Sequence, residues 1–220
     1  MFGIRTAYSY SERNPMVKKS QKKQHKMPTQ RRSRQTVDDI LAAATHVLGK
    51  EGFARATTNR IAERAGVGVA SIYQYFADKS SIVSTLITRR AESTLQMLEE
   101  ALLAHADDSA EALAMDLANR LVLSLENAKG TLVQLILMAP LLGQLDHIRQ
   151  LRQRGTDLIA KELRRRRPHL DEPQALQLAF VVLHSVMGVV HGYLYSNTAN
   201  LYGHELTAVI QNIITTHLRE

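Results

Sequence analysis

Apolar residues recur at spacings of three and four along almost the whole chain after residue 35, which is the period of a helix that buries one face. The first such stretch contains Val37, Ile40, Leu41, Ala44, Val47 and Leu48. Thr36 and Asp39 are typical of a helix N-terminus, and Gly49 or Gly52 is typical of a helix end. The pattern therefore predicts a first helix that starts at Thr36.

Two short helices are predicted next, separated by a tight turn. Thr57 is a typical N-cap for a helix that runs to Arg64, and Gly66 suits the left-handed position that ends such a helix. Only three residues separate this helix from a third one, which runs to about Phe76. Two short helices with this turn between them are typical of a helix-turn-helix, whose second helix enters the major groove of DNA.

The remainder of the chain also has helical periodicity. Asp78 is a typical cap for a long fourth helix that begins at Lys79. The predicted ranges are Lys79 to Ala106, Ala110 to Ala128, Thr131 to Leu142, Asp146 to Arg166, Glu172 to Tyr195 and His204 to Leu218, with Pro140 expected to kink or end the third of these. No alternating run of β-branched residues is long enough for a sheet, so the predicted fold class is all-α, with an N-terminal three-helix HTH domain followed by a larger helical domain.

Charge is concentrated at the N-terminus. Residues 1–35 hold ten Lys and Arg and one acid, whereas the whole chain of 220 residues has a net charge of +7. The basic pI therefore belongs to a tail, which points to a polyanionic partner. The tail lacks apolar periodicity and is predicted to be largely disordered. Met16 and Met27 are alternative starts to Met1, and either would remove much of this charge.

Composition excludes several classes of site. The chain has no Cys, which excludes disulfides, Cys-ligated zinc, iron–sulfur clusters and thiol catalysis, and agrees with a cytoplasmic location. The first ten residues lack the apolar region of a secretory signal, although a transit peptide shares the basic composition of the tail. The span from Gln174 to Tyr202 has no charged residue, but its Gln and Asn residues favour a helix buried by protein over one in a membrane.

The third helix has two predicted faces. Val69, Ile72 and Phe76 share the inward face, with Ala70, Ser71 and Gln74 on the outward face and Tyr73 and Tyr75 on the flanks. Ser71 and Gln74 are candidates for contact with base edges, because a Gln amide can bridge N6 and N7 of adenine. Val69 and Ala70 are candidates for contact with a thymine methyl group. Ordinary exposed surface is the alternative interpretation.

Phe53 to Ile82 resembles the DNA-binding domain of the TetR family of transcriptional regulators. The resemblance rests on Phe53, Thr57, Ile61, Ala62, Ala65, Gly66, Val67, Ile72, Tyr73, Tyr75, Phe76 and Lys79 at the family's spacing. Gly68 departs from the Ser that often caps the recognition helix, and Ala70 from a frequent Gly. The resemblance implies a helix-turn-helix DNA-binding domain over 36–82 and a helical effector-binding and dimerisation domain over 83–220, after the basic tail of 1–35.

The resemblance also implies roles for individual residues. Thr57 and Thr58, followed by Asn59, would meet phosphates at the start of the second helix, although capping alone also explains Thr57. Tyr73, Tyr75 and Lys79 would contact phosphates. The arginines of residues 31–34 would either enter a minor groove as an arm or remain a solvated tail. The DNA-binding set is Thr57, Thr58, Asn59, Val69, Ala70, Ser71, Tyr73, Gln74, Tyr75 and Lys79.

The implied partners are a palindromic double-stranded DNA operator, a second copy of the chain and a small apolar or amphipathic effector. The homodimer would form through the two C-terminal helices, where Gly188 and Gly192 permit close helix approach between or within subunits. His147, His184 and His191 have no carboxylate that completes a tight cluster, so we expect neither a metal nor a cofactor. The sequence identifies no effector-binding residue, although Met97, Met115, Met138 and Met187 suit either an adaptable cavity or the core.

No catalytic motif is present. The pattern Gly66-x-Gly68-x-x-Ser71 only approaches a dinucleotide fingerprint, because a helix precedes it where a strand is needed. We therefore expect a non-enzymatic, cytoplasmic, homodimeric and sequence-specific DNA-binding transcriptional regulator, a repressor released by a small-molecule effector. The alternative is a helical interaction protein with a nonspecific nucleic-acid-binding basic tail.

Overall fold

The computed structural model describes residues 31–195 and 205–219, and every regular element in these two ranges is an α-helix. The helices are α1 (Arg31–Arg55), α2 (Thr58–Ala65), α3 (Val69–Tyr75), α4 (Lys79–Ala104), α5 (Ala110–Leu141), α6 (Leu145–Arg166), α7 (Glu172–Tyr195) and α9 (Leu206–Leu218). The all-α prediction is confirmed. The basic residues of 1–30 and the alternative starts lie outside the described residues.

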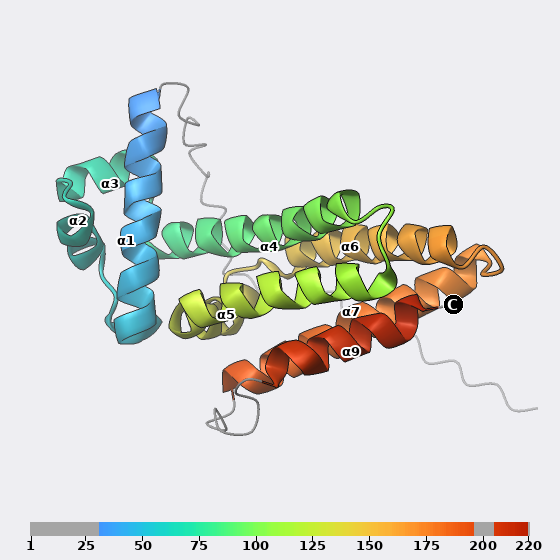
Figure 1. Ribbon diagram of the computed structural model, residues 1–220. Helices are drawn as coiled ribbons and strands as arrows, with labels where there is room; N and C mark the ends of the chain where they lie inside the picture. Colours follow the sequence, from blue (N-terminus) through green and yellow to red (C-terminus); the bar gives the residue numbers. More distant parts are fainter. Residues whose placement is uncertain (1–30, 196–204, 220) are drawn as a thin grey trace, which may run out of the picture.

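The first three helices form a recognition unit at one end of the molecule (Figure 1). Helices α2 and α3 lie on the side of α1 that faces away from the rest of the chain. Helix α4 runs from this unit into a bundle that it forms with α5, α6, α7 and α9. Helices α7 and α9 pack against each other along one side of the bundle.

Local capping signals fix the helix ends around the turn. The Thr57 side chain accepts a hydrogen bond from the backbone N–H of Arg60, and Gly66 ends α2 in the left-handed conformation with φ of 68°. Asp78 and Ser81 form a reciprocal capping box at the start of α4. These three predictions from sequence are confirmed.

The predicted start of the first helix is wrong. Helix α1 begins at Arg31, and the Thr36 hydroxyl donates to the carbonyl oxygen of Arg32 inside the helix instead of capping it. Residues 31–35 are thus helical where a disordered segment was expected. Arg and Gln are good helix formers, and adding residues to an existing helix costs far less than starting a new one. Gly52, with φ of 75°, interrupts the helix, which resumes and ends at Arg55.

The predicted break before Thr131 is also wrong, because α5 is one helix of 32 residues. Gly130 lies about two-thirds of the way along it, where α5 crosses α1. A Cβ atom on Gly130 would stand 2.8 Å from the carbonyl oxygen of Gly49. Gly130 therefore permits a close helix crossing rather than ending a helix. Pro140 falls in the last turn, at the end that was predicted.

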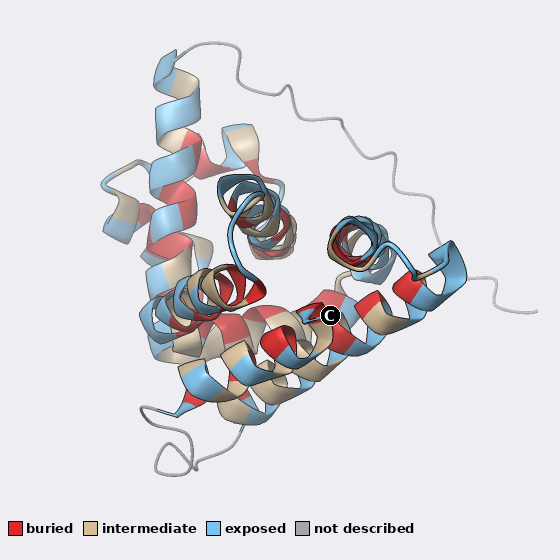
Figure 2. Ribbon diagram, turned by 45° about the vertical axis from the view of Figure 1, so that its right-hand side comes forward, coloured by how far each residue is buried: buried red, intermediate tan, exposed pale blue. Residues whose placement is uncertain are grey.

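Two hydrophobic clusters divide the molecule, and Figure 2 shows buried residues on the inward sides of the helices. The N-terminal cluster centres on Ile40, Ile61 and Ile72 and also takes in Leu135 and Ala139 of α5. The second cluster fills much of the bundle and includes residues of α4, α5, α6, α7 and α9. Helices α4 and α5 contribute to the two clusters, so they join the recognition unit to the bundle.

Two helices in the described part of the chain, α5 and α7, are long and apolar enough to cross a membrane by length and composition alone. Core helices of other proteins pass the same test. Helix α5 contributes Leu113, Leu125 and Leu135 to the two clusters. The uncharged span singled out in the sequence coincides with α7 as far as Tyr195, and its remainder lies outside the described residues.

Candidate functional site

The two predicted faces of α3 are present in the structure. On the inward face, Ile72 is fully buried, Phe76 is 5% exposed at the cap, and Val69 packs half-buried against the N-terminal cluster. Ala70 and Gln74 are exposed on the outward face, and Ser71 is half-buried. Tyr73 is 50% exposed, so its ring and hydroxyl are accessible. The outward face therefore offers an amide and a phenol to a partner outside the chain.

The start of α2 lies beside this face. The Oγ1 atom of Thr58 and the phenolic oxygen of Tyr73 are 3.2 Å apart and share a hydrogen bond. Thr57 Oγ1 accepts from Arg60 N at 3.3 Å, which leaves the O–H of Thr57 free to donate elsewhere. Asn59 follows in the first turn and is exposed. These side chains and the outward face of α3 make one polar surface.

Lys79 links the start of α4 to the end of α1 by hydrogen bonds, a role that the sequence did not indicate. Its Nζ atom donates to the carbonyl oxygens of Phe53 at 2.6 Å and Ala56 at 2.8 Å, and it stands 4.2 Å from the centre of the Phe53 ring. An ammonium group has three N–H donors, so one remains for a phosphate. Tyr75 is half-buried and packs against the N-terminal cluster. The phosphate roles of these two residues stay predictions.

Basic residues extend the polar surface along α1. Arg31 and Arg32 are exposed in the first turn of that helix, so residues 31–34 form a helical extension and not a flexible arm. Arg60 of α2 forms an ion pair with Glu51 of α1. This pair holds the start of α2 against the end of α1, near the Lys79 contacts.

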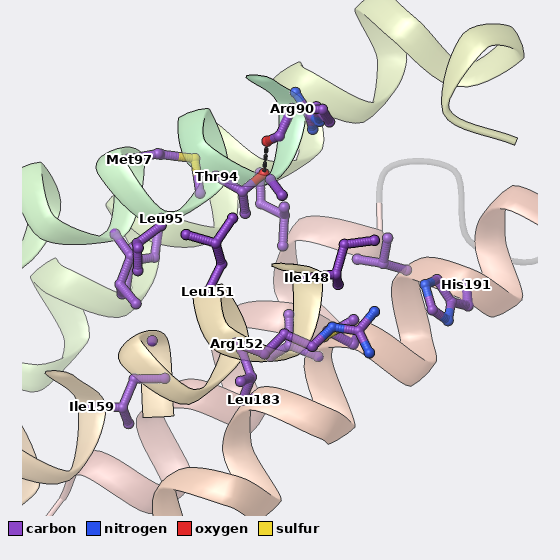
Figure 3. Close-up of a pocket in the computed structure, with 18 of the residues that line it drawn as sticks. Arg90, Thr94, Leu95, Met97, Ile148, Leu151, Arg152, Ile159, Leu183 and His191 are labelled. Atoms are coloured by element: carbon purple, nitrogen blue, oxygen red, sulfur yellow. Dashed lines mark hydrogen bonds between the residues drawn. The ribbon is translucent and has the colours of Figure 1, made fainter. Parts of the chain in front are cut away.

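A cavity of about 500 Å³ lies inside the bundle, between α4, α5, α6, α7 and the end of α9. Most of its lining is Leu, Ile and Val, and Met97 and Met187 also face it. Figure 3 shows Leu95 and Met97 of α4 with Leu151 and Ile159 of α6 around this space. Its size and apolar lining are typical of a small-molecule site. Met138 belongs to the N-terminal cluster and Met115 is exposed.

Few polar groups enter this cavity. Arg90 Nη1 donates to Ser124 Oγ at 2.6 Å, and burial lowers the pKa of the Arg90 guanidinium. Burial also lowers the pKa of Arg152, and burial together with nearby Arg152 lowers the pKa of His191. Glu162 is the acid in the lining, and it accepts hydrogen bonds from Arg165 and Arg166. Sequence analysis missed Arg90 and Arg152, because helical periodicity does not distinguish a filled interior from a hollow one.

The outer face of α7 is apolar and open. Phe180, Val181 and Tyr195 are large exposed side chains, and the Phe180 ring stacks on His184 with 3.9 Å between ring centres. A Cβ atom on Gly188 or Gly192 would meet nothing within 4 Å. These glycines therefore serve no close packing within the described part of one protomer.

A metal site needs several ligating side chains close together. Within residues 31–195 and 205–219, no three His, Cys, Asp or Glu side chains come together as a metal would require. His147 lies 3.9 Å from Glu92, whereas His184 stacks on Phe180. The expectation that the protein holds no metal stays a prediction.

Comparisons with known proteins agree with this geometry. Residues 40–86 match the sequence profile of the bacterial regulatory proteins of the tetR family. The uncharacterized HTH-type transcriptional regulator YvkB of Bacillus subtilis strain 168 is 36% identical over 67 residues, which are 30% of this chain and 35% of that protein. The match thus spans about a third of the length of that curated relative.

Solved structures extend the likeness over most of the chain. A TetR-family transcriptional regulator from Mesorhizobium loti has a TM-score of 0.71 at 18% identity, covering 86% of this chain and 98% of that one. SmeT, the repressor of the Stenotrophomonas maltophilia multidrug efflux pump SmeDEF, has a TM-score of 0.62 at 21% identity, covering 83% and 91%. SmeT has also been solved in complex with triclosan. At these identities the likeness shows the fold.

Proposed function

We propose that this chain, a member of the TetR family of bacterial regulatory proteins, acts as a homodimeric repressor that a small molecule releases from its operator. The observation that carries the proposal is the exposed polar face of α3 beside the start of α2. Exposed amide and phenol groups at this position are available to an external partner, and a duplex groove supplies both acceptors and donors. The cytoplasm is where such a regulator meets DNA.

Each residue of the surface has a proposed role. Gln74 and Ser71 read base edges in the major groove, and Ala70 and Val69 approach thymine methyl groups. The Thr57 hydroxyl, Thr58, Asn59 and the two tyrosines position the unit on phosphates. Lys79 gives its third N–H to a phosphate while its other two hold the end of α1. Phosphate contacts fix the position of the protein along the DNA, and α3 determines which base sequence is preferred.

The homodimer is proposed to form through α7 and α9. A single seven-residue recognition helix offers few base contacts, whereas two-fold symmetry doubles them on a palindrome. The open face of α7, with Phe180, Val181 and the glycines at 188 and 192, supports this interface. Val181→Glu should shift the protein to monomers in sedimentation experiments. A dimer of unchanged stability would contradict this interface.

Helix α4 is the proposed link between effector and operator. Its 26 residues span about 39 Å at the α-helical rise of 1.5 Å per residue. One end carries Lys79, fixed to α1, and the other lines the cavity through Leu95, Met97 and Leu98. A small tilt at the cavity moves the recognition units apart, and an effector that selects this state lowers operator affinity by a typical 1–3 kcal/mol.

Operator mapping followed by one substitution tests the proposal. We expect a short palindrome to be protected from cleavage at physiological salt. Gln74→Ala should cost about 1–3 kcal/mol on that site and relax preference at one position per half-site. Gln150→Ala, a matched change of an exposed Gln on α6, should have no effect.

Two outcomes would contradict the proposal. Unchanged operator preference in Gln74→Ala would remove the base-reading role from α3. Binding that shows no site preference, and that disappears when residues 1–26 are deleted, would favour a helical interaction protein with a nonspecific basic tail.

A further inference from the structure

The charges inside the cavity are unbalanced. Among its lining residues the ionisable side chains are Arg90, Arg152, Glu162 and His191. Glu162 is already neutralised, because Arg165 and Arg166 donate to its two oxygens at 2.5 to 2.9 Å. The remaining charges are two guanidinium groups on a mostly apolar lining, with Arg90 half-buried and Arg152 exposed to solvent. Both groups have lost part of their hydration, which lowers their pKa, and a partly dehydrated cation beside apolar side chains attracts an anion more strongly than one in bulk water.

The two arginines differ in how many of their guanidinium N–H groups form hydrogen bonds within the protein. Arg90 gives a hydrogen bond to the Ser124 hydroxyl at 2.6 Å and also lines a second, smaller cavity with Ser93 and Asn127. The Arg152 guanidinium has no hydrogen bond or ion pair to any side chain in the part of the chain that the structure describes. All five N–H donors of Arg152 therefore remain for something that enters the cavity.

The surroundings of Arg152 define one end of a site. In Figure 3 its guanidinium extends from α6 toward His191 of α7, with Ile148 beside them. The lowered pKa of His191 keeps the imidazole neutral at physiological pH, so it can donate one hydrogen bond without adding charge. Leu151, Leu183 and Ile159, which also line the cavity, offer only apolar contacts.

We propose that the cavity binds an amphipathic carboxylate, with its head group held by Arg152 and His191 and its apolar body among the leucines of α4, α5 and α6. A guanidinium fork matches a carboxylate in a two-bond geometry, and the imidazole N–H adds a third donor. At about 30 Å³ for each water-sized group, 500 Å³ holds on the order of 15 such groups. A straight chain of about ten carbons fits this volume. The inference rests on the proposed function of the cavity as the effector site.

Calorimetric titration of the full-length protein with three ten-carbon probes tests the head-group assignment. Decanoate should bind at least tenfold more tightly than 1-decanol, and decylamine should bind more weakly than both. Arg152→Gln should remove the advantage of decanoate over decanol and leave decanol binding unchanged. Arg152→Lys should restore part of the advantage, because it keeps the charge but not the fork.

Arg149→Gln is the matched control. Arg149 lies one turn earlier on α6, pairs with Asp146 and is outside the cavity. It should leave all three titrations unchanged. Equal affinities for decanoate and decanol would overturn the proposal, as would an Arg152→Gln protein that loses both equally. Absence of binding by all three probes would overturn it too.

Operator binding separates this inference from the proposed function. Decanoate should weaken binding to the mapped operator by at least fivefold in the unaltered protein and not in Arg152→Gln. If decanoate binds through Arg152 while operator affinity stays constant, the head-group assignment holds and the effector-release mechanism fails. If the protein has no operator but still prefers decanoate through Arg152, only the proposed regulatory function fails.

Discussion

The recognition unit and the bundle bury their apolar side chains differently. In the recognition unit and the start of α4, Ile40, Ile61, Ile72 and Ile82 are all fully buried in one filled cluster. In the bundle, the leucines of α4, α5 and α6 surround about 500 Å³ of space. Filled cores hold one arrangement, because every side chain has contacts on all sides. A hollow one leaves side chains free to repack around a guest.

The same contrast applies to polar groups. Donors of the recognition unit are either paired inside the unit, as in the Lys79 contacts, or exposed on one surface. Donors of the bundle include the Arg152 guanidinium, which lines a mostly apolar cavity. The free donors of the recognition unit are therefore available only to a partner that binds on its outer surface. The bundle offers its donors to a molecule small enough to enter the cavity.

Removing side-chain volume should give the largest difference in stability between the two regions. Ile72→Ala should lower the free energy of unfolding by about 2–5 kcal/mol, because it opens a cavity in a filled core. Leu98→Ala should cost about 1 kcal/mol, because Leu98 is half-buried beside space that is already empty. Urea unfolding at one protomer concentration measures both. Equal losses would mean that the bundle is as tightly packed as the recognition unit.

The Lys79 contacts offer the next largest effect. Lys79→Met keeps the apolar stem but removes hydrogen bonds to Phe53 and Ala56, each of which has a charged donor. Loss of such bonds should lower the free energy of unfolding by about 1.5–3 kcal/mol, in addition to any loss of operator affinity. Lys50→Met on α1, which is exposed, should change stability by less than about 0.5 kcal/mol. If the two variants unfold alike, the fastening role of Lys79 is wrong.

Substitution of two glycines compares the tight crossing of α1 and α5 with the helix surface that lines the cavity. Gly130→Ala should be destabilising by about 1 kcal/mol, because its Cβ would stand 2.8 Å from a backbone oxygen of Gly49. Gly155→Ala on α6 should be neutral or stabilising, since its nearest contacts are side-chain atoms of Leu95 and Leu98 at 3.8 Å. Thermal unfolding of both proteins measures this difference. A stabilised Gly130→Ala protein would show that α1 and α5 can separate at little cost.

The smallest effect concerns pH. Burial and nearby Arg152 lower the pKa of His191 below its ordinary value of about 6.5, so the unfolded chain binds more protons between the two values. The contribution to stability is complete above about pH 6.5 and declines as the pH falls toward the folded-state pKa. Arg152→Gln should raise the pKa of His191 in an NMR titration, whereas Arg149→Gln should not. An unchanged value in Arg152→Gln would place Arg152 too far from His191 to share a head group.

Sequence predicted the recognition unit better than the bundle for a physical reason. Thr57, Gly66 and Asp78 act on the backbone next to them, so their identity alone indicates where helices begin and end. The role of Gly130, by contrast, depends on Gly49, which lies far away in sequence. Arg152 is one of several arginines on α6, and nothing in the neighbouring sequence distinguishes a guanidinium that lines a cavity from one on the outer surface.

The placement of Leu135 and Ala139 has a consequence for exchanging parts between proteins. These side chains belong to α5 by sequence but to the N-terminal cluster by contact. Gln134, one residue before Leu135, accepts a hydrogen bond from the backbone N–H of Phe53, and Thr131 donates to the carbonyl oxygen of Thr45. A hybrid made by joining residues up to Ile82 to a foreign sensor would therefore leave α1 with an apolar patch and an unmatched donor. The transferable piece is discontinuous: it needs the last third of α5 as well.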